Sequence, residues 1–142
     1  MRFDLTVNEF VKELALNREI EVFGEQFWRP YCHVYDFARA VVTALGADEE
    51  KVAYNIFNVG DNEENYTKKM IVDEIIKRMP NAKVRYIHKQ EDPRDYRVDF
   101  QKIRAELGFK VTKRVPDGIL EIMDAIRNKI FLNPDDPRYR NS

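Results

Sequence analysis

The sequence predicts a small α/β domain, because amphipathic helical stretches alternate with short strand-like stretches along most of the chain. Apolar residues recur at three- and four-residue intervals in the helical stretches, and polar and apolar residues alternate in the extended ones. The 142 residues fit one domain, and 44% of them are hydrophobic, which is typical of a globular chain. Since the strands are few and short, we expect a small mixed sheet.

Two helices and two extended segments are predicted in the first third of the chain. Residues 4–17 carry apolar side chains at i, i+3, i+4 and i+7, which predicts a helix with Asp4 as its N-cap. Residues 19–24 alternate polar and apolar side chains and should form a strand. Residues 31–34 should be extended, and residues 36–45 should form a helix that the aspartate at its start caps.

The same alternation continues in the rest of the chain. The predicted elements, in order, are a strand (53–60), a helix (67–79), a strand (82–87), a charged loop (90–97), a short helix (99–108) and a helix (116–126). Thr67 and Asp99 are favourable N-caps, Pro80 stops one helix, and Pro116 is a favourable first helical residue. We assign residues 1–132 to one domain and expect 133–142 to be a mobile polar tail.

Composition excludes several classes of protein. The net charge of −1 gives no overall field that would favour nucleic acid or a membrane surface. No apolar run approaches the ~20 residues that a membrane span requires. The single cysteine excludes an internal disulfide, which agrees with a cytoplasmic location.

Cys32 and His33 are a weak candidate for chemistry. Zinc requires three or four ligands at suitable spacing, and this pair has no CxxC or HxxxH partner. A nucleophilic thiolate would need a base placed across space, and the second histidine, His88, lies at the end of another predicted strand. We therefore expect no metal site and no catalytic residue, but a buried cysteine beside a histidine that is structural or lines a ligand site.

A dinucleotide-binding loop is also missing from the sequence. The five glycines lie at positions 24, 46, 60, 108 and 118, which is too dispersed for a GxGxxG or P-loop motif. We therefore expect no cofactor site within this chain, because close approach to a pyrophosphate requires clustered glycines.

Arginines provide the positive signal. Arg29 stands among three aromatic residues, and Arg94 and Arg97 flank Tyr96. A guanidinium can bind two phosphate oxygens at once, and aromatic neighbours suit a nucleobase or a sugar ring. The alternative interpretation is that these arginines are solvated surface residues paired with nearby aspartates.

Four stretches together resemble extended short-chain dehydrogenases that epimerise or dehydrate nucleotide sugars. These stretches are residues 1–24, 29–45, 54–75 and 91–109. They are similar, in family order, to the segment after the Rossmann core, the Arg-x-x-x-(His/Tyr)-Val-x-Asp motif, the Asn-x-Gly strand with its helix, and the Arg-Asp loop with the helix that follows it. The resemblance covers nearly the whole chain and implies the small C-terminal substrate domain of that family.

The resemblance also implies roles for individual residues. The arginine matching Arg29 contacts the diphosphate of the nucleotide sugar, and so does the loop arginine, which we match to Arg94 with Arg97 assisting. Val22 and Phe23 match the segment along the nucleobase. Asn8 matches a position near the ligand. These assignments imply a nucleotide-diphosphate sugar as the partner.

Two features of the family are absent from this sequence. Its glycine-rich NAD loop is missing, and no tyrosine is followed four residues later by a lysine. The chain thus resembles the substrate-binding half without the N-terminal Rossmann half, which in the full-length enzyme binds NAD. Met1 aligns with an internal position of full-length relatives, which a fragment, a truncated frame or a separately encoded half would each produce.

We therefore expect nucleotide-sugar recognition without catalysis by the chain alone. Residues 53–59 would add a strand to the larger sheet of a Rossmann-half partner, and the apolar edge left exposed favours self-association. Two alternatives stay open: a non-catalytic nucleotide-sugar binder and a protein-interaction module. The nucleobase, the sugar and the choice among epimerase, dehydratase and decarboxylase are undetermined.

Overall fold

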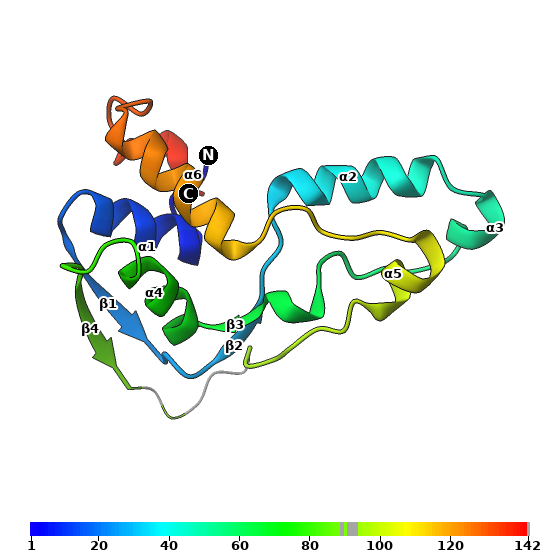
Figure 1. Ribbon diagram of the computed structural model, residues 1–142, viewed down its shortest axis with the longest axis horizontal. Coiled ribbons are helices and arrows are strands. Elements are labelled where there is room, and N and C mark those ends of the chain that lie inside the picture. The colour runs from blue at the N-terminus through cyan, green and yellow to red at the C-terminus, as the bar shows by residue number, and fades with distance from the viewer. Residues whose placement is uncertain (89, 91–93, 142) are drawn as a thin grey trace.

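The structure is a computed structural model that describes residues 1–88, 90 and 94–141, and it confirms the α/β prediction (Figure 1). The helices are α1 (Thr6–Ala15), α2 (Val34–Leu45), α3 (Glu49–Val52), α4 (Lys68–Ile76), α5 (Gln101–Leu107) and α6 (Val115–Arg127). The strands are β1 (Glu19–Phe23), β2 (Trp28–Pro30), β3 (Asn65–Thr67) and β4 (Lys83–Ile87), and short 3-10 turns occupy η1 (Asn62–Glu64) and η2 (Pro137–Tyr139). Within the described ranges, no helix combines the length and apolar character needed to cross a membrane.

The described strands form two separate pairs rather than the single mixed sheet that we expected. β1 and β4 pair in parallel, from Glu19 opposite Lys83 to Phe23 opposite Ile87. β2 and β3 pair antiparallel. The two pairs are separate because Gly24, with a left-handed φ of 61°, turns the chain directly after β1.

The main core lies where α1, α4 and α6 pack with the β1–β4 pair (Figure 1). Each of these elements except β4 supplies fully buried aliphatic side chains: Val11, Val22, Ile71, Val72, Ile75 and Ile119. Full burial of one such side chain contributes about 1.5–3 kcal/mol of hydrophobic free energy. This core therefore holds α1 and α6 in place relative to each other.

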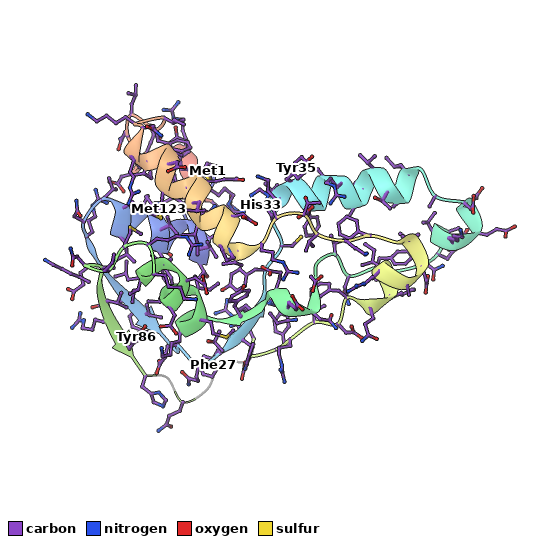
Figure 2. All side chains as sticks on the ribbon, viewed as in Figure 1. Met1, Phe27, His33, Tyr35, Tyr86 and Met123 are labelled. Atoms are coloured by element: carbon purple, nitrogen blue, oxygen red, sulfur yellow. The ribbon has the colours of Figure 1, made fainter. Side chains whose placement is uncertain are left out.

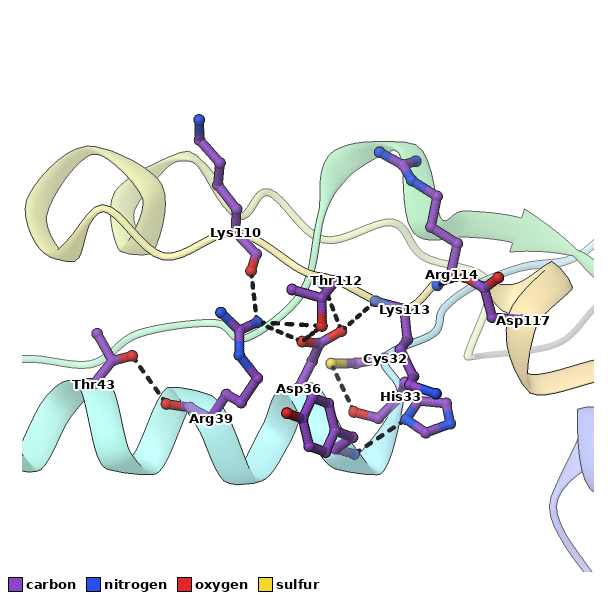
Figure 3. A network of polar contacts seen from close by, with 11 residues as sticks. Cys32, His33, Asp36, Arg39, Thr43, Lys110, Thr112, Lys113, Arg114 and Asp117 are labelled. Atoms are coloured by element: carbon purple, nitrogen blue, oxygen red, sulfur yellow. Dashed lines mark hydrogen bonds and ion pairs between the residues drawn. The ribbon is translucent and has the colours of Figure 1, made fainter. Parts of the chain in front are cut away.

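An arm consisting of α2, α3 and α5 extends from this body (Figure 1). Its own small core contains Ala40 of α2, Ile103 of α5 and Phe109. The Asp36 carboxylate, fully buried in the first turn of α2, joins the arm to the linker between α5 and α6 (Figure 3). It accepts hydrogen bonds from the Thr112 amide at 2.9 Å, the Thr112 hydroxyl at 2.9 Å and the Lys113 amide at 2.8 Å. Arg39 also forms an ion pair with this carboxylate, with its Nη1 2.7 Å from the Asp36 Oδ1.

Three predicted helix caps are wrong. The N-cap residue of α5 is Phe100 rather than Asp99, which lies one residue earlier and accepts the Gln101 amide hydrogen at 2.9 Å. Asp4 does not cap α1, because its carboxylate binds Arg2 at 2.7 Å, and the N-cap residue of this helix is Leu5, which has no capping side chain. Asp36 lies inside α2, where the N-cap is His33, whose Nδ1 accepts the Tyr35 amide hydrogen at 3.2 Å. Asp4 binds an arginine, and Asp36 binds an arginine and several hydrogen-bond donors. Such partners bind a carboxylate more strongly than a helix terminus does.

Two predicted strands differ from the structure as well. Extended pairing occurs at 28–30 instead of 31–34, and no strand forms at 53–60. In the latter segment Tyr54 has a left-handed φ of 57°, and both Tyr54 and Ile56 are exposed. A strand requires a hydrogen-bonding neighbour, and the described part of the chain supplies none there.

The C-terminal segment packs against the body instead of forming the mobile tail that we expected. Asp135 binds the Nζ of Lys12, a fully buried lysine of α1, at 2.9 Å. The Tyr139 ring meets the buried Phe3 ring edge-on, with centroids 5.6 Å apart, and the Phe3 amide donates to the Tyr139 carbonyl at 2.7 Å. Asp135 thus gives the buried lysine a second counter-charge beside Glu13, which lies 2.6 Å from the same Nζ, and these contacts pack the segment against the folded body.

We expect the Asp36→Ala substitution to lower the free energy of unfolding by roughly 2–4 kcal/mol, because it leaves two linker amides and Arg39 without their acceptor. Urea unfolding followed by circular dichroism measures the change. Lys51→Ala, in an exposed pair on α3, is the control and should change stability by less than ~1 kcal/mol.

The Asp36 carboxylate should also make the free energy of unfolding depend on pH. Burial raises the pKa of Asp36, but hydrogen bonds from Lys113, Arg39 and Thr112 outweigh that effect and hold the pKa below its usual value. The stabilisation is therefore present above the unfolded-state pKa of about 4 and is lost as the pH falls through the lower folded-state value. Asp36→Asn should flatten the loss of stability below pH ~4, and an unchanged acid profile would contradict this assignment.

Candidate functional site

A cavity of about 570 Å³ opens where α1, β2 and α6 meet. It brings together Asn8, Arg29 and Arg94, three of the six predicted site residues, from separate parts of the chain. Its walls are mainly apolar, with cationic and polar side chains interspersed. A concave, largely apolar site with a few convergent polar groups is the usual form of a small-molecule site.

Arg29 lies at the centre of β2, opposite Tyr66 of β3. Its Nη1 donates to the Trp28 carbonyl at 2.6 Å, and its guanidinium carbon lies 5.7 Å from the centroid of the Tyr96 ring. Asp95 accepts the Trp28 amide hydrogen at 2.7 Å. These contacts attach the 94–97 loop to β2 and so bring Arg94 to the same cavity as Arg29.

The other three predicted residues do not line the cavity. Arg97 stacks over the Trp28 ring at 4.8 Å, so it supports the loop. Val22 is fully buried in the main core, and a contact with a nucleobase would have to come from its backbone. Phe23 is partly exposed, and its carbonyl accepts a hydrogen bond at 2.7 Å from the Nζ of Lys68, which does line the cavity.

The N-terminal end of α1 also opens into the cavity. Leu5, Thr6, Val7 and Asn8 all border it. The Nδ2 of the Asn8 side chain donates to the Arg2 carbonyl at 2.7 Å, and the N-cap residue provides no side-chain hydrogen bond to the first turn of the helix. The first backbone amides of a helix have no partner within the helix, and together with the positive end of the helix dipole they favour a bound anion.

A buried carboxylate that the sequence analysis missed, Glu64, also lines the cavity. Glu64 is only 2% exposed, and it accepts the Val115 amide hydrogen at 2.9 Å and a hydrogen bond from the Arg114 Nη1 at 3.2 Å. Burial raises its pKa, and the Val115 amide and the positive charge of Arg114 offset part of that rise. Both partners come from the start of α6, some fifty residues away, so no local pattern could have revealed the contact.

Cys32 and His33 also line the cavity. Burial raises the pKa of the Cys32 thiol to about 11, with help from the charges of Asp36 and Glu64, so the thiol is protonated at neutral pH. His33 lies where α2 begins beside α6 (Figure 2), and its Nε2 contacts a Glu121 oxygen at 3.1 Å. Because Nδ1 accepts a backbone hydrogen, the hydrogen-bond network assigns the ring proton to Nε2. The residues that the structure describes contain no group of three metal-binding side chains.

Tyr31 presents a buried polar atom beside the cavity. The Tyr31 hydroxyl forms no hydrogen bond with any residue that the structure describes. Burial raises the pKa of this hydroxyl, and the nearby Thr6 side chain and the charge of Arg29 offset part of the rise. A buried hydroxyl without a well-formed hydrogen bond is costly, and this one borders the cavity.

Comparison with known proteins relates part of the chain to one family. The NAD dependent epimerase/dehydratase family pattern matches residues 5–60. Among solved structures, UDP-glucuronic acid 4-epimerase from Bacillus cereus, in complex with UDP-glucuronic acid and NAD, superposes with a TM-score of 0.76 at 20% identity, over 90% of this chain and 41% of that one. UDP-glucose 4-epimerase from Thermus thermophilus gives a TM-score of 0.70 at 20% identity, over 86% and 40% of the two chains.

The same fold occurs in a protein named for a different substrate. L-threonine dehydrogenase from Clostridium difficile gives a TM-score of 0.72 at 18% identity, over 87% of this chain and 40% of that one. At these identities the likeness establishes the fold alone. The chain spans about 41% of the length of the Bacillus cereus enzyme.

We expect Tyr31→Phe to leave the free energy of unfolding unchanged or to raise it by up to ~1 kcal/mol, because the substitution removes a buried hydroxyl that has no hydrogen-bond partner among the residues that the structure describes. Urea unfolding of the two proteins without ligand tests this. A loss greater than ~1 kcal/mol would mean that the hydroxyl has a structural partner in the free protein.

Proposed function

We propose that this chain recognises a nucleotide-diphosphate sugar as part of an NAD-dependent epimerase or dehydratase. The observation that carries the proposal is the cavity that gathers Arg29, Arg94 and the uncapped start of α1. The family match over residues 5–60 supports the class of enzyme. The UDP-glucuronic acid complex of the Bacillus cereus enzyme, which has a similar fold, supports the class of ligand.

The chemistry of the cavity suits a diphosphate. Two guanidinium groups and the end of a helix dipole provide positive charge and directed N–H donors, and both match phosphate oxygens. The Tyr96 ring beside Arg29 restricts the guanidinium and leaves an aromatic surface next to it. A nucleoside monophosphate or a small amino acid such as threonine would use fewer of these groups.

The described residues do not fit NAD. The glycines lie on separate segments, and no two of them are close enough in sequence to form a phosphate-binding loop. The sequence also contains no Tyr-x-x-x-Lys pair. In this proposal the hydride chemistry and its acid–base group therefore belong to another part of the enzyme, and this chain binds and orients the sugar nucleotide.

An exposed apolar face supports the view that another part of the enzyme covers the arm. Along α2, Val34, Val41, Val42 and Leu45 are each more than half exposed and follow one side of the helix. Isolated exposed apolar residues are ordinary, whereas a continuous stripe marks an interaction surface. We propose that a dinucleotide-binding half covers this stripe, and that the stripe mediates self-association when the chain is alone.

The first test is calorimetric titration of the folded chain with UDP, UDP-glucose and UDP-glucuronic acid. We expect Arg29→Ala and Arg94→Ala each to weaken binding by about 10- to 100-fold, the effect of losing a charge-assisted hydrogen bond of ~1.5–3 kcal/mol. Arg29→Lys should recover only part of the affinity, because lysine lacks the planar fork. Arg127→Ala, at the far end of α6, is the matched control, and equal affinity of all variants would refute the proposal.

The second test concerns the stripe on α2. We expect sedimentation velocity to show concentration-dependent oligomers of the chain, and Val42→Glu combined with Leu45→Glu to yield monomers with an unchanged circular dichroism spectrum. These side chains are 70% and 82% exposed, so the substitutions should not disturb the fold. A wild-type chain that is monomeric at high concentration would contradict self-association.

A further inference from the structure

Arg114 is a cavity residue that neither the sequence patterns nor the resemblance identified. It is the N-cap residue of α6, and it lines the same cavity as Arg29 and Arg94. Its side chain is 45% exposed, so it is within reach of a ligand. Its backbone follows directly on the linker that Asp36 holds through Thr112 and Lys113.

A buried carboxylate holds the guanidinium in place. Figure 3 shows the Arg114 side chain reaching from the start of α6 toward the segment that leads into β3. There its Nη1 binds Glu64 at 3.2 Å, while the second oxygen of Glu64 accepts the Val115 amide hydrogen at 2.9 Å. The Glu64 carbonyl in turn accepts the Tyr31 amide hydrogen at 2.9 Å, two residues beyond Arg29. A short chain of contacts thus fixes Arg114 relative to Arg29.

The Arg114 guanidinium has N–H donors that none of the described residues accepts. Both of its side-chain hydrogen bonds, to Glu64 and to the exposed Glu63 at 2.7 Å, use Nη1. Its Nε and Nη2 groups donate no hydrogen bond to any residue in the described parts of the chain. An arginine carries five N–H donors, and those on the Nε–Nη2 edge are among the ones that engage a carboxylate or phosphate bidentately.

We propose that Arg114 is a third guanidinium of the site and binds an anionic oxygen group of the ligand. The group is either a phosphate of the diphosphate or a carboxylate carried by the sugar. Glu64 is the positioning residue that presets the guanidinium, so little side-chain entropy is lost on binding. This inference rests on the proposed function, because it adds a contact to the same site.

The experiment is calorimetry with the Arg114→Ala variant and the same three probes: UDP, UDP-glucose and UDP-glucuronic acid. We expect an affinity loss of about tenfold or more and a weaker dependence of affinity on salt, since an ionic contact is removed. Arg114→Lys should keep the salt dependence and recover part of the affinity. Glu64→Gln retains an acceptor for the Val115 amide and should weaken binding less than Arg114→Ala does. Arg127→Ala again serves as the control.

The pattern across probes identifies the anion. Equal losses for all three probes assign Arg114 to the diphosphate, and a loss confined to UDP-glucuronic acid assigns it to the sugar carboxylate. Unchanged affinity in both folded Arg114 variants, beside weakened binding in Arg29→Ala, overturns this inference and leaves the proposed function standing. If the wild-type chain binds none of the probes, the proposed function fails and this inference fails with it.

Discussion

The buried Asp36 carboxylate is the constraint on which the arrangement of the site depends. It sits on the arm, in the first turn of α2, yet its hydrogen-bond donors include the backbone of the linker that leads into α6. A charge buried without such donors would cost several kcal/mol, so the arm and the linker are stable only together. Because α6 begins directly after this linker, the same contact sets the position of one wall of the cavity.

The cavity is built from the ends of elements whose other parts belong to the main core. α1 and α6 are held by aliphatic side chains such as Val11 and Ile119, and their N-terminal turns remain at the surface of that core. β2 adds Arg29 between them, and the 94–97 loop adds Arg94 through its contacts with Trp28. The packed core therefore holds the residues of the loop and of the helix ends at the cavity, and binding sites are commonly positioned in this way.

Local patterns were sufficient for the β1 and β4 strands and for every described helix except the single-turn α3, which they did not predict. They failed where a distant partner decides the outcome. Asp36 has the sequence of a helix cap, but donors more than seventy residues away give it a different role. Arg29 and Arg94 were identifiable as candidates from residue type and resemblance. Glu64 and Arg114 were not, because a contact between the segment before β3 and the start of α6 joins them, and no local pattern encodes that contact.

The central claim is that one cavity, bounded by α1, β2 and α6, binds the anionic part of a nucleotide. An NMR titration of the isotopically labelled chain with UDP tests it directly, since each backbone amide reports on its own surroundings. The account predicts saturable shifts concentrated at the first turn of α1, at residues 28–33 and at the start of α6. Shifts confined to other surfaces, such as the C-terminal ends of α1 and α6, or the absence of any shift in a folded chain, would contradict it.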